Sequence, residues 1–266
     1  MIVYDQLLRK LEFDAFPNRI VSLVPSLSEL IWDLGLQEQL VGITKFCIHP
    51  EEMHNTILRV GGTKNPSIEK IRHLKPDLIV ANKEENTLET ISQLEKEFNV
   101  YVSDVNDLNS AYQMISDLGK ICNRSNESFM LNKSIQSEFD KIIKVKNLRI
   151  VYLIWKNPLM CVGGSNFINS LLQELGLENC FSEIHRYPSI SLEDIKKTKP
   201  DFLFLSSEPY PFTSSDFIDF KSQMPDLKMI LVNGEYFSWY GSRMKKAATY
   251  FNSLLDEIKK ASKKEA

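Results

Sequence analysis

The chain carries the same pattern in each of its halves: Ser67-Ile-Glu-Lys-Ile-Arg-His-Leu-Lys-Pro-Asp77 and Ser191-Leu-Glu-Asp-Ile-Lys-Lys-Thr-Lys-Pro-Asp201. In each copy the serine can cap a helix, and the glutamate two residues later suits the helix N-terminus. The Lys-Pro pair ends the helix, because a residue before proline avoids the α-helical region. A short apolar stretch that is typical of a buried strand follows each copy, at 78–81 and 202–205.

Two further repeats extend this pattern. Arg19-Ile-Val-Ser-Leu-Val-Pro25 is similar to Arg149-Ile-Val-Tyr-Leu-Ile-Trp155, and each predicts a buried strand. Leu34-Gly35-Leu36 is similar to Leu175-Gly176-Leu177, and each glycine stands where a helix would end with a left-handed residue. Alternating strands and helices predict parallel sheets. The sequence therefore predicts an α/β fold of two Rossmann-like lobes.

The segment between the halves predicts a helix. Its apolar residues recur mostly every three or four positions, and no glycine or proline stands between Ser125 and Leu148. We therefore expect an N-terminal lobe over residues 1–123, one long linking helix over 124–147 and a C-terminal lobe over 148–266. A single stiff connection would limit hinge motion between the lobes.

The composition excludes several classes of protein. Of 266 residues, 43% are hydrophobic and 25% charged, with a net charge of −3 and no basic patch, so no nucleic-acid partner is expected. No uncharged apolar run approaches the roughly 20 residues of a transmembrane helix. The first residues are charged and lack the apolar core of a signal peptide, which predicts a cytoplasmic protein; a removed leader would instead place it in the periplasm.

The potential metal ligands are scattered. Cys47, Cys122, Cys161 and Cys180 form no Cys-x-x-Cys motif and are expected to be reduced and mostly buried. No cluster of histidine, cysteine and acidic residues has the spacing of a structural zinc site. We expect no bound metal and no intrinsic cofactor.

With both halves in view, the chain resembles the helical-backbone metal receptor family, the substrate-binding proteins of ABC importers for siderophores, haem and cobalamin. The resemblance covers nearly the whole chain and rests on the order of many short motifs: Asp5, Arg9, Arg19–Ser26, Glu29, Leu34-Gly35, Leu40-Val-Gly42, Gly61, Glu69, Lys75-Pro-Asp77, Asn157-Pro158, Gly163-Gly164, Lys199-Pro-Asp201 and Trp239-Tyr-Gly-Ser-Arg243. The cobalamin-binding branch is the most similar, through the aromatic segment that ends at Arg243.

The resemblance implies a partner and a ligand class. By position, Glu69 and Glu193 would pair with arginines of a membrane permease; alternatively, both only stabilise a helix dipole. Cobalamin-binding relatives often have tryptophans near the positions of Thr63 and Asn82, which argues against cobalamin more than against the fold.

A ligand is expected at the carboxyl ends of the parallel strands, where the loops of two facing lobes would line one cleft. The candidate ligand-binding residues in these loops are Ser26, Phe46, His49, Lys64, Trp155, Ser165, Trp239, Tyr240 and Arg243.

The aromatic stretch Tyr236-Phe237-Ser238-Trp239-Tyr240 offers flat apolar surface to a planar macrocycle. Part of it should fill the core, but we expect Trp239 to line the cleft and Arg243 to meet an anionic edge of the ligand.

Two interpretations are possible for each of three candidate binding elements: His49, residues 163–166 and Ser26. His49 is either a structural histidine or an axial ligand to cobalt or iron. Residues 163–166 either form a tight turn or offer backbone N–H groups to an anion. Ser26 is better explained as a helix N-cap than as a nucleophile.

The sequence leaves three functions open. The first is a non-enzymatic binding protein for a bulky metal chelate, with cobalamin or another corrinoid as the leading ligand. The second is a cytoplasmic carrier or sensor of such a ligand without a transporter. The third is an enzyme or metal-cluster protein on the same scaffold, which the absence of a Gly-x-Ser-x-Gly motif disfavours.

Overall fold

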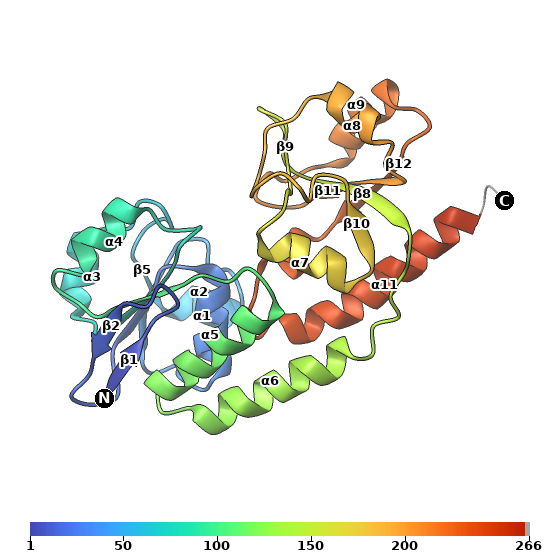
Figure 1. Ribbon diagram of the computed structural model, residues 1–266. Coiled ribbons are helices and arrows are strands. Elements are labelled where there is room, and N and C mark those ends of the chain that lie inside the picture. Colours follow the sequence, from blue (N-terminus) through green and yellow to red (C-terminus); the bar gives the residue numbers. More distant parts are fainter. Residues whose placement is uncertain (264–266) are drawn as a thin grey trace. The chain divides into compact units, whose positions relative to one another are not determined.

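The computed structural model describes residues 1–263, which form two compact units (Figure 1). Neither unit is one continuous piece of chain. Unit 1 consists of Met1–Val105, Asn109–Ser137 and Trp239–Lys245. Unit 2 consists of Asn106–Leu108, Glu138–Ser238 and the residues from Lys246 onward. The segment 239–245 therefore belongs to unit 1, although it lies near the end of the sequence.

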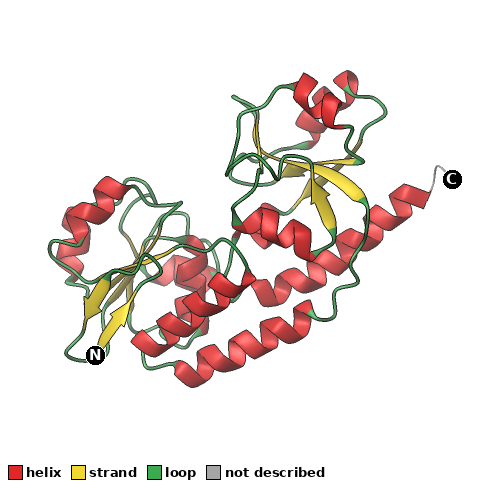
Figure 2. Cartoon of the chain, in the orientation of Figure 1, coloured by secondary structure: helices red, strands yellow, loops and turns green. Residues whose placement is uncertain are grey.

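Unit 1 holds a small antiparallel hairpin, β1–β2, and a parallel sheet with the strand order β5-β4-β3-β6-β7. The strands are drawn in yellow and the helices in red in Figure 2. Helices α3 and α4 cover one face of this sheet, because Ile71, Ile91 and Leu94 pack on its alternate apolar residues. The elements are β1 (Ile2–Tyr4), β2 (Lys10–Glu12), β3 (Ile20–Ser22), α1 (Pro25–Asp33), β4 (Leu40–Ile43), α2 (Glu51–Thr56), β5 (Leu58–Arg59), α3 (Ile68–Leu74), β6 (Leu78–Asn82), α4 (Leu88–Leu94), β7 (Val100–Ser103), and most of α5 (Leu108–Ile121) and α6 (Ser125–Phe139).

Unit 2 is built in the same way. Its parallel strands have the order β10-β8-β11-β12, and β9 pairs antiparallel with β8. Its elements are β8 (Leu148–Trp155), β9 (Met160–Cys161), α7 (Phe167–Glu174), β10 (Leu177–Asn179), α8 (Leu192–Thr198), β11 (Phe202–Ser206), α9 (Ser214–Gln223), β12 (Lys228–Val232), α10 (Gly234–Ser238) and most of α11 (Met244–Lys263). The fold class predicted from the repeats is confirmed: parallel α/β sheets in two lobes.

The repeated pattern forms the local structure that it predicts. Ser67 and Ser191 are the N-caps of α3 and α8, and each side chain accepts a hydrogen bond from the backbone N–H three residues on. Lys75 and Lys199, which precede the prolines, close these helices in the left-handed conformation with φ of 46° and 49°. Gly35 and Gly176 are left-handed as predicted, with φ of 77° and 78°.

An arginine and an aspartate join each copy of the pattern to the central strand of its sheet. In unit 1 the Asp77 carboxylate accepts the Arg19 backbone N–H at 3.0 Å, and the Arg19 Nε donates to the Leu74 carbonyl at 2.7 Å. In unit 2 the Asp201 carboxylate accepts the Arg149 N–H at 2.7 Å, and the Arg149 guanidinium donates to the Thr198 carbonyl. Each arginine thus satisfies a carbonyl at a helix C-terminus.

The helix between the halves is shorter than the sequence predicts. Helix α6 ends at Phe139, and residues 142–147 are not helical. Other groups take the backbone hydrogen bonds here: the Ile143 N–H donates to the Asn252 side chain at 3.1 Å, and the Val145 N–H donates to the Leu175 carbonyl at 3.1 Å. These contacts inside unit 2 replace the helical bonds that the apolar spacing favours. The predicted boundaries of the lobes stay a prediction.

The structure also corrects the interpretation of Ser26. Helix α1 begins at Pro25, its N-cap is Val24, and no side chain caps it. Ser26 therefore stands inside the first turn. A proline suits this position, because its missing N–H would have no partner in the helix.

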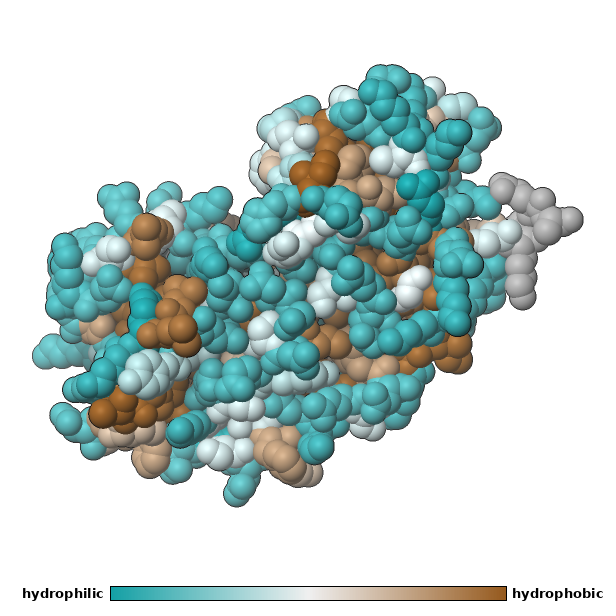
Figure 3. Space-filling model, viewed as in Figure 1, coloured by the Kyte–Doolittle hydropathy of each residue, from teal (hydrophilic) through white to brown (hydrophobic). Residues whose placement is uncertain are grey.

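The face shown in Figure 3 is mostly hydrophilic, and its hydrophobic residues form separate patches. Of the helices within residues 1–263, none combines the length and the apolar character that crossing a bilayer requires.

The two repeated glycines provide a matched test of the packing. A Cβ on Gly176 would lie 1.9 Å from the Val145 carbonyl oxygen, whereas a Cβ on Gly35 would have its nearest neighbour at 3.9 Å. Gly35→Ala should cost about 1 kcal/mol of unfolding free energy through the left-handed backbone alone. Gly176→Ala should cost about 2 kcal/mol more, because backbone must shift. Urea denaturation followed by circular dichroism measures both losses, and equal losses would contradict the packing described for Gly176.

Candidate functional site

In unit 1 the carboxyl ends of the parallel strands bring four of the predicted residues to one edge of the sheet. Ser26 follows β3, Phe46 and His49 follow β4, and Lys64 follows β5. Loops at this edge are the usual binding surface of a parallel α/β sheet. The four residues therefore lie at the carboxyl edge of the sheet, and their role in binding stays a prediction.

The loop after β4 exposes apolar side chains. Phe46 and Ile48 are 50% and 48% exposed, whereas Cys47 between them is fully buried. The Cys47 thiol is held at 3.2 Å from both the Ser28 and Thr44 hydroxyls. Residues 45 and 46 form a turn, closed by a hydrogen bond from the Cys47 N–H to the Thr44 carbonyl at 3.2 Å, so Phe46 and Ile48 stay exposed on either side of the buried thiol. Ile48 was not among the predicted residues, although it stands in the same apolar stretch.

Two asparagines tie the loops of this edge together. The Asn82 side-chain N–H₂ donates to the Ser103 carbonyl and hydroxyl, both at 3.1 Å. The Asn86 side-chain N–H₂ donates to the carbonyls of Thr63 at 2.8 Å and Leu23 at 3.3 Å, and its oxygen accepts the Asn82 N–H at 2.8 Å. The loops after β3, β5, β6 and β7 are therefore fixed to one another by buried polar groups.

This network explains two departures from the cobalamin-binding pattern. Thr63 and Asn82, the two positions at which the resemblance implied tryptophans, are both buried here. The Asn82 carboxamide also accepts the backbone N–H groups of Glu84 and Glu85. At these positions the chain has structural polar residues in place of aromatic surface.

Trp239 and Arg243 pack within unit 1. The Arg243 guanidinium carbon lies 4.5 Å from the centre of the Trp239 ring, and the His49 ring meets Trp239 edge-on at 5.9 Å. As whole residues, Trp239 and Arg243 are 8% and 7% exposed. Trp239 thus contacts His49 of the β4 loop and is mostly buried, and the expectation that it lines a cleft stays a prediction.

Arg243 forms a buried ion pair with Glu29 of α1. Its Nε donates to Glu29 Oε2 at 2.8 Å, and its Nη2 donates to Oε1 at 3.0 Å. Both side chains are almost fully buried. Removing one partner of such a pair typically costs about 3–5 kcal/mol, because the other charge is left without compensation. In the sequence, Glu29 stands out only as a position shared with the family; nothing near it indicates its partner.

The aromatic stretch 236–240 is divided between the two units. Phe237 is fully buried in unit 2 against Tyr152, and Tyr236 stacks on Tyr250 at 4.9 Å. Trp239 and Tyr240 belong to unit 1, where Tyr240 is buried. Only part of the stretch can therefore offer surface to a ligand.

In unit 2 the corresponding edge carries another aromatic pair. Trp155 at the end of β8 is 39% exposed, and its ring meets Tyr210 edge-on at 5.8 Å. Beside it, Lys156 donates to Asp216 at 2.7 Å and to Asp219 at 3.0 Å. The hydrogen bond to Asp216 raises the pKa of Lys156 well above its usual value. Tyr210 was not singled out from the sequence.

The glycine turn that leads into α7 uses its N–H groups internally. The Gly163 N–H donates to the Arg186 carbonyl at 2.7 Å and the Gly164 N–H to the Ile184 carbonyl at 2.6 Å. These two groups are not available to an anion, which favours the tight-turn interpretation. Ser165 next to them is exposed with φ of 56°.

The two candidate permease contacts occupy equivalent places. Glu69 and Glu193 stand in the first turns of α3 and α8, and both are exposed. Glu193 accepts a hydrogen bond from Lys196 at 3.0 Å. Exposed pairs of this kind contribute little to stability.

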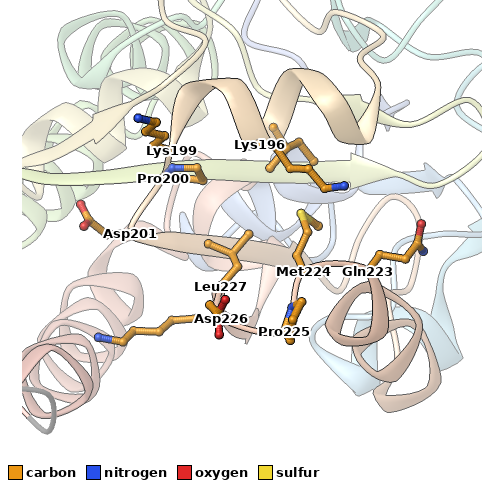
Figure 4. Close-up of a pocket in the computed structure, with 11 residues that line it drawn as sticks. Lys196, Lys199, Pro200, Asp201, Gln223, Met224, Pro225, Asp226 and Leu227 are labelled. Carbon is orange, nitrogen blue, oxygen red and sulfur yellow. The ribbon is translucent and has the colours of Figure 1, made fainter.

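A pocket of about 630 Å³ lies elsewhere in unit 2 (Figure 4). Asp201 directly precedes β11 and Lys228 begins β12, so the pocket lies at the amino ends of these strands. This is the edge opposite the predicted binding loops. Its labelled side chains include Lys196, Lys199, Asp201 and Met224, and none belongs to the predicted site.

Metal ligands do not gather within residues 1–263: no group of three or more histidine, cysteine or acidic side chains is placed to hold an ion. The four cysteines are free thiols. Burial raises the pKa of Cys122 and of Cys161, in each case to about 12, so both stay protonated at neutral pH.

Curated relatives of the chain are binding proteins. The vitamin B12-binding protein of Vibrio vulnificus is 27% identical over 195 residues, which is 71% of each chain. An ABC transporter substrate-binding lipoprotein of Bacillus subtilis is 28% identical over 198 residues, or 70% of this chain and 62% of the relative.

Solved structures share the fold. The periplasmic vitamin B12 binding protein BtuF of Vibrio cholerae superimposes with a TM-score of 0.72 at 20% identity, over 92% of this chain and 98% of that one. Periplasmic haem-binding proteins are similar to the chain as well. These relatives are described as periplasmic proteins or lipoproteins, so they give no support to the cytoplasmic prediction.

One family description matches most of the sequence, over residues 20–227. This range includes both copies of the repeated pattern and the central strands of both sheets. The chain therefore belongs to the periplasmic binding protein family.

Proposed function

We propose that this chain is the substrate-binding protein of an ABC importer and that it binds a metal chelate, with cobalamin or another corrinoid as the leading ligand. The observation that carries the proposal is the exposed apolar pair Phe46 and Ile48, which stands beside the His49–Trp239 contact at the carboxyl edge of unit 1. Apolar surface of this kind suits a flat macrocycle. The relatives named for vitamin B12 support the choice of ligand.

The surroundings of this edge support reversible binding of an intact ligand. The Asn82–Asn86 network fixes the loops before any ligand arrives, so less order must be gained on binding. Ser26 is almost fully buried in the first turn of α1, and the known relatives are binding proteins. We therefore propose that the chain is not an enzyme and needs no cofactor of its own. The shared cleft between two lobes stays a prediction.

The predicted ligand residues of unit 2 are part of this proposal. Trp155 and Tyr210 form an apolar pair at the carboxyl edge of their own sheet, as Phe46 and Ile48 do in unit 1. Ser165 of unit 2 is exposed and can donate a hydrogen bond to a polar group of a ligand, as the exposed Lys64 can at the edge of unit 1. His49 contacts Trp239, and its side chain can either line the site or bind the metal as an axial ligand.

Titration with cobalamin, cobinamide, haem and ferric siderophores, followed by tryptophan quenching, tests the ligand class. Phe46→Ala should weaken binding of the preferred compound about tenfold, because an aromatic contact of roughly 1.5 kcal/mol is lost. Phe129→Ala is the matched control: Phe129 lies on α6 of unit 1, is 59% exposed and is remote in sequence from the binding loops. Equal affinities of both variants and the unchanged protein would place the site elsewhere.

We also propose that Glu69 and Glu193 bind a permease, since they occupy equivalent first-turn positions in the two units. Glu69→Lys should lower ligand uptake by cells that depend on this protein and leave the ligand affinity unchanged, because charge reversal replaces attraction to an arginine by repulsion. Glu89→Lys, at the first turn of α4, is the control. Uptake that falls equally in both variants would indicate a general charge effect instead of docking.

A further inference from the structure

Trp239 is held in a defined place by contacts on two elements of unit 1. Its ring lies 4.5 Å from the Arg243 guanidinium carbon, and the His49 ring meets it edge-on at 5.9 Å. A guanidinium near an aromatic face is attracted by the ring quadrupole. The indole is therefore positioned by a cation from its own segment and by a ring of the β4 loop.

Arg243 is itself held by α1. Its two hydrogen bonds to Glu29 are parallel, at 2.8 Å and 3.0 Å, which is the rigid bidentate geometry of an arginine–carboxylate pair. The backbone adapts to this contact as well. Gly241 has φ of 105°, and a Cβ there would lie 3.3 Å from the Leu30 Cβ and 3.5 Å from the Ser26 carbonyl oxygen. A glycine thus lets the segment pass close to α1.

We propose that Arg243 is a positioning residue for Trp239 and that Glu29 fixes Arg243, so that the pair prepares the indole for a flat ligand. This inference rests on the proposed function and replaces the expectation that Arg243 meets an anionic edge of the ligand. The guanidinium is directed at Glu29 and Trp239 and is 7% exposed. An indole that is already fixed loses little freedom on binding, so its contact contributes more fully to affinity.

A double-mutant cycle with cyanocobalamin distinguishes positioning from direct contact. Glu29→Gln should raise the Kd about tenfold when Trp239 is present. In the Trp239→Leu background the same substitution should raise the Kd less than about twofold, because the effects of residues that act through one another are not additive. An equal rise in both backgrounds would overturn the proposal. A lower Kd in Glu29→Gln would also overturn it, since a released Arg243 would then be contacting the ligand.

The chain offers a matched control for the ion pair. Arg72 and Glu97 also form a bidentate arginine–glutamate pair in unit 1, at 2.6–3.1 Å, but both are exposed. Glu97→Gln removes the same carboxylate chemistry without touching Trp239. It should leave the Kd for cyanocobalamin unchanged.

A ligand-free measurement keeps the proposal testable if no corrinoid binds or if Glu29→Gln fails to fold. The protein is labelled with 5-fluorotryptophan, and its three fluorine signals are assigned by replacing Trp32, Trp155 and Trp239 in turn by phenylalanine. Arg243→Lys keeps the positive charge but loses the planar fork. It should shift or broaden the Trp239 signal and leave those of Trp32 and Trp155 in place.

The two measurements fail in different ways. An unchanged Trp239 signal in Arg243→Lys would overturn the positioning role, whatever the ligand. A shifted signal without binding of cobalamin, cobinamide or haem would support the positioning role and overturn the proposed ligand class.

Discussion

In each unit one aspartate carboxylate accepts the backbone N–H of an arginine at the start of a central strand. The side chain of that arginine donates to the last carbonyl of the helix that stands just before the aspartate in sequence. Asp77 with Arg19, and Asp201 with Arg149, therefore join helix, turn and strand at the amino edge of the sheet. The strands that follow, β6 beside β3 and β11 beside β8, are paired in register from this point. The register of parallel strands is the same along their length. The aspartate–arginine contacts at the amino edge therefore also help to fix the relative positions of the loops at the carboxyl edge.

The carboxyl edge of unit 1 reverses the usual distribution of polar and apolar groups. The amides of Asn82 and Asn86 are buried and hydrogen bonded, while Phe46 and Ile48 are exposed. Buried amides are tolerated because every loop carbonyl they meet also needs a donor. Apolar side chains that gather on the surface are typical of binding sites. The combination gives a rigid support with an apolar surface, which suits selective binding of a large ligand.

Features set by neighbours in sequence could be predicted, and features set by distant partners could not. The caps Ser67 and Ser191 and the left-handed Gly35 and Gly176 depend on a few adjacent residues, and the structure confirms them. The end of α6 at Phe139 depends on Asn252 and Leu175, which no local pattern reveals. Likewise, the polar character of Asn82 indicates a loop, but only its contacts with Ser103 and Asn86 show that it is buried. The candidate residues at strand ends follow from the fold; which aromatic rings stay at the surface does not.

The placement of residues 239–245 in unit 1 has a consequence for how the molecule can be divided. The sequence repeats suggest a cut between the two halves, yet a fragment that ends before residue 239 would lack the cation that balances Glu29. Such a fragment would leave the Glu29 carboxylate of helix α1 without its partner, and it would expose the apolar surface that Trp239 and Tyr240 normally cover. Unit 1 therefore needs a short segment from the other half of the chain to complete its packing.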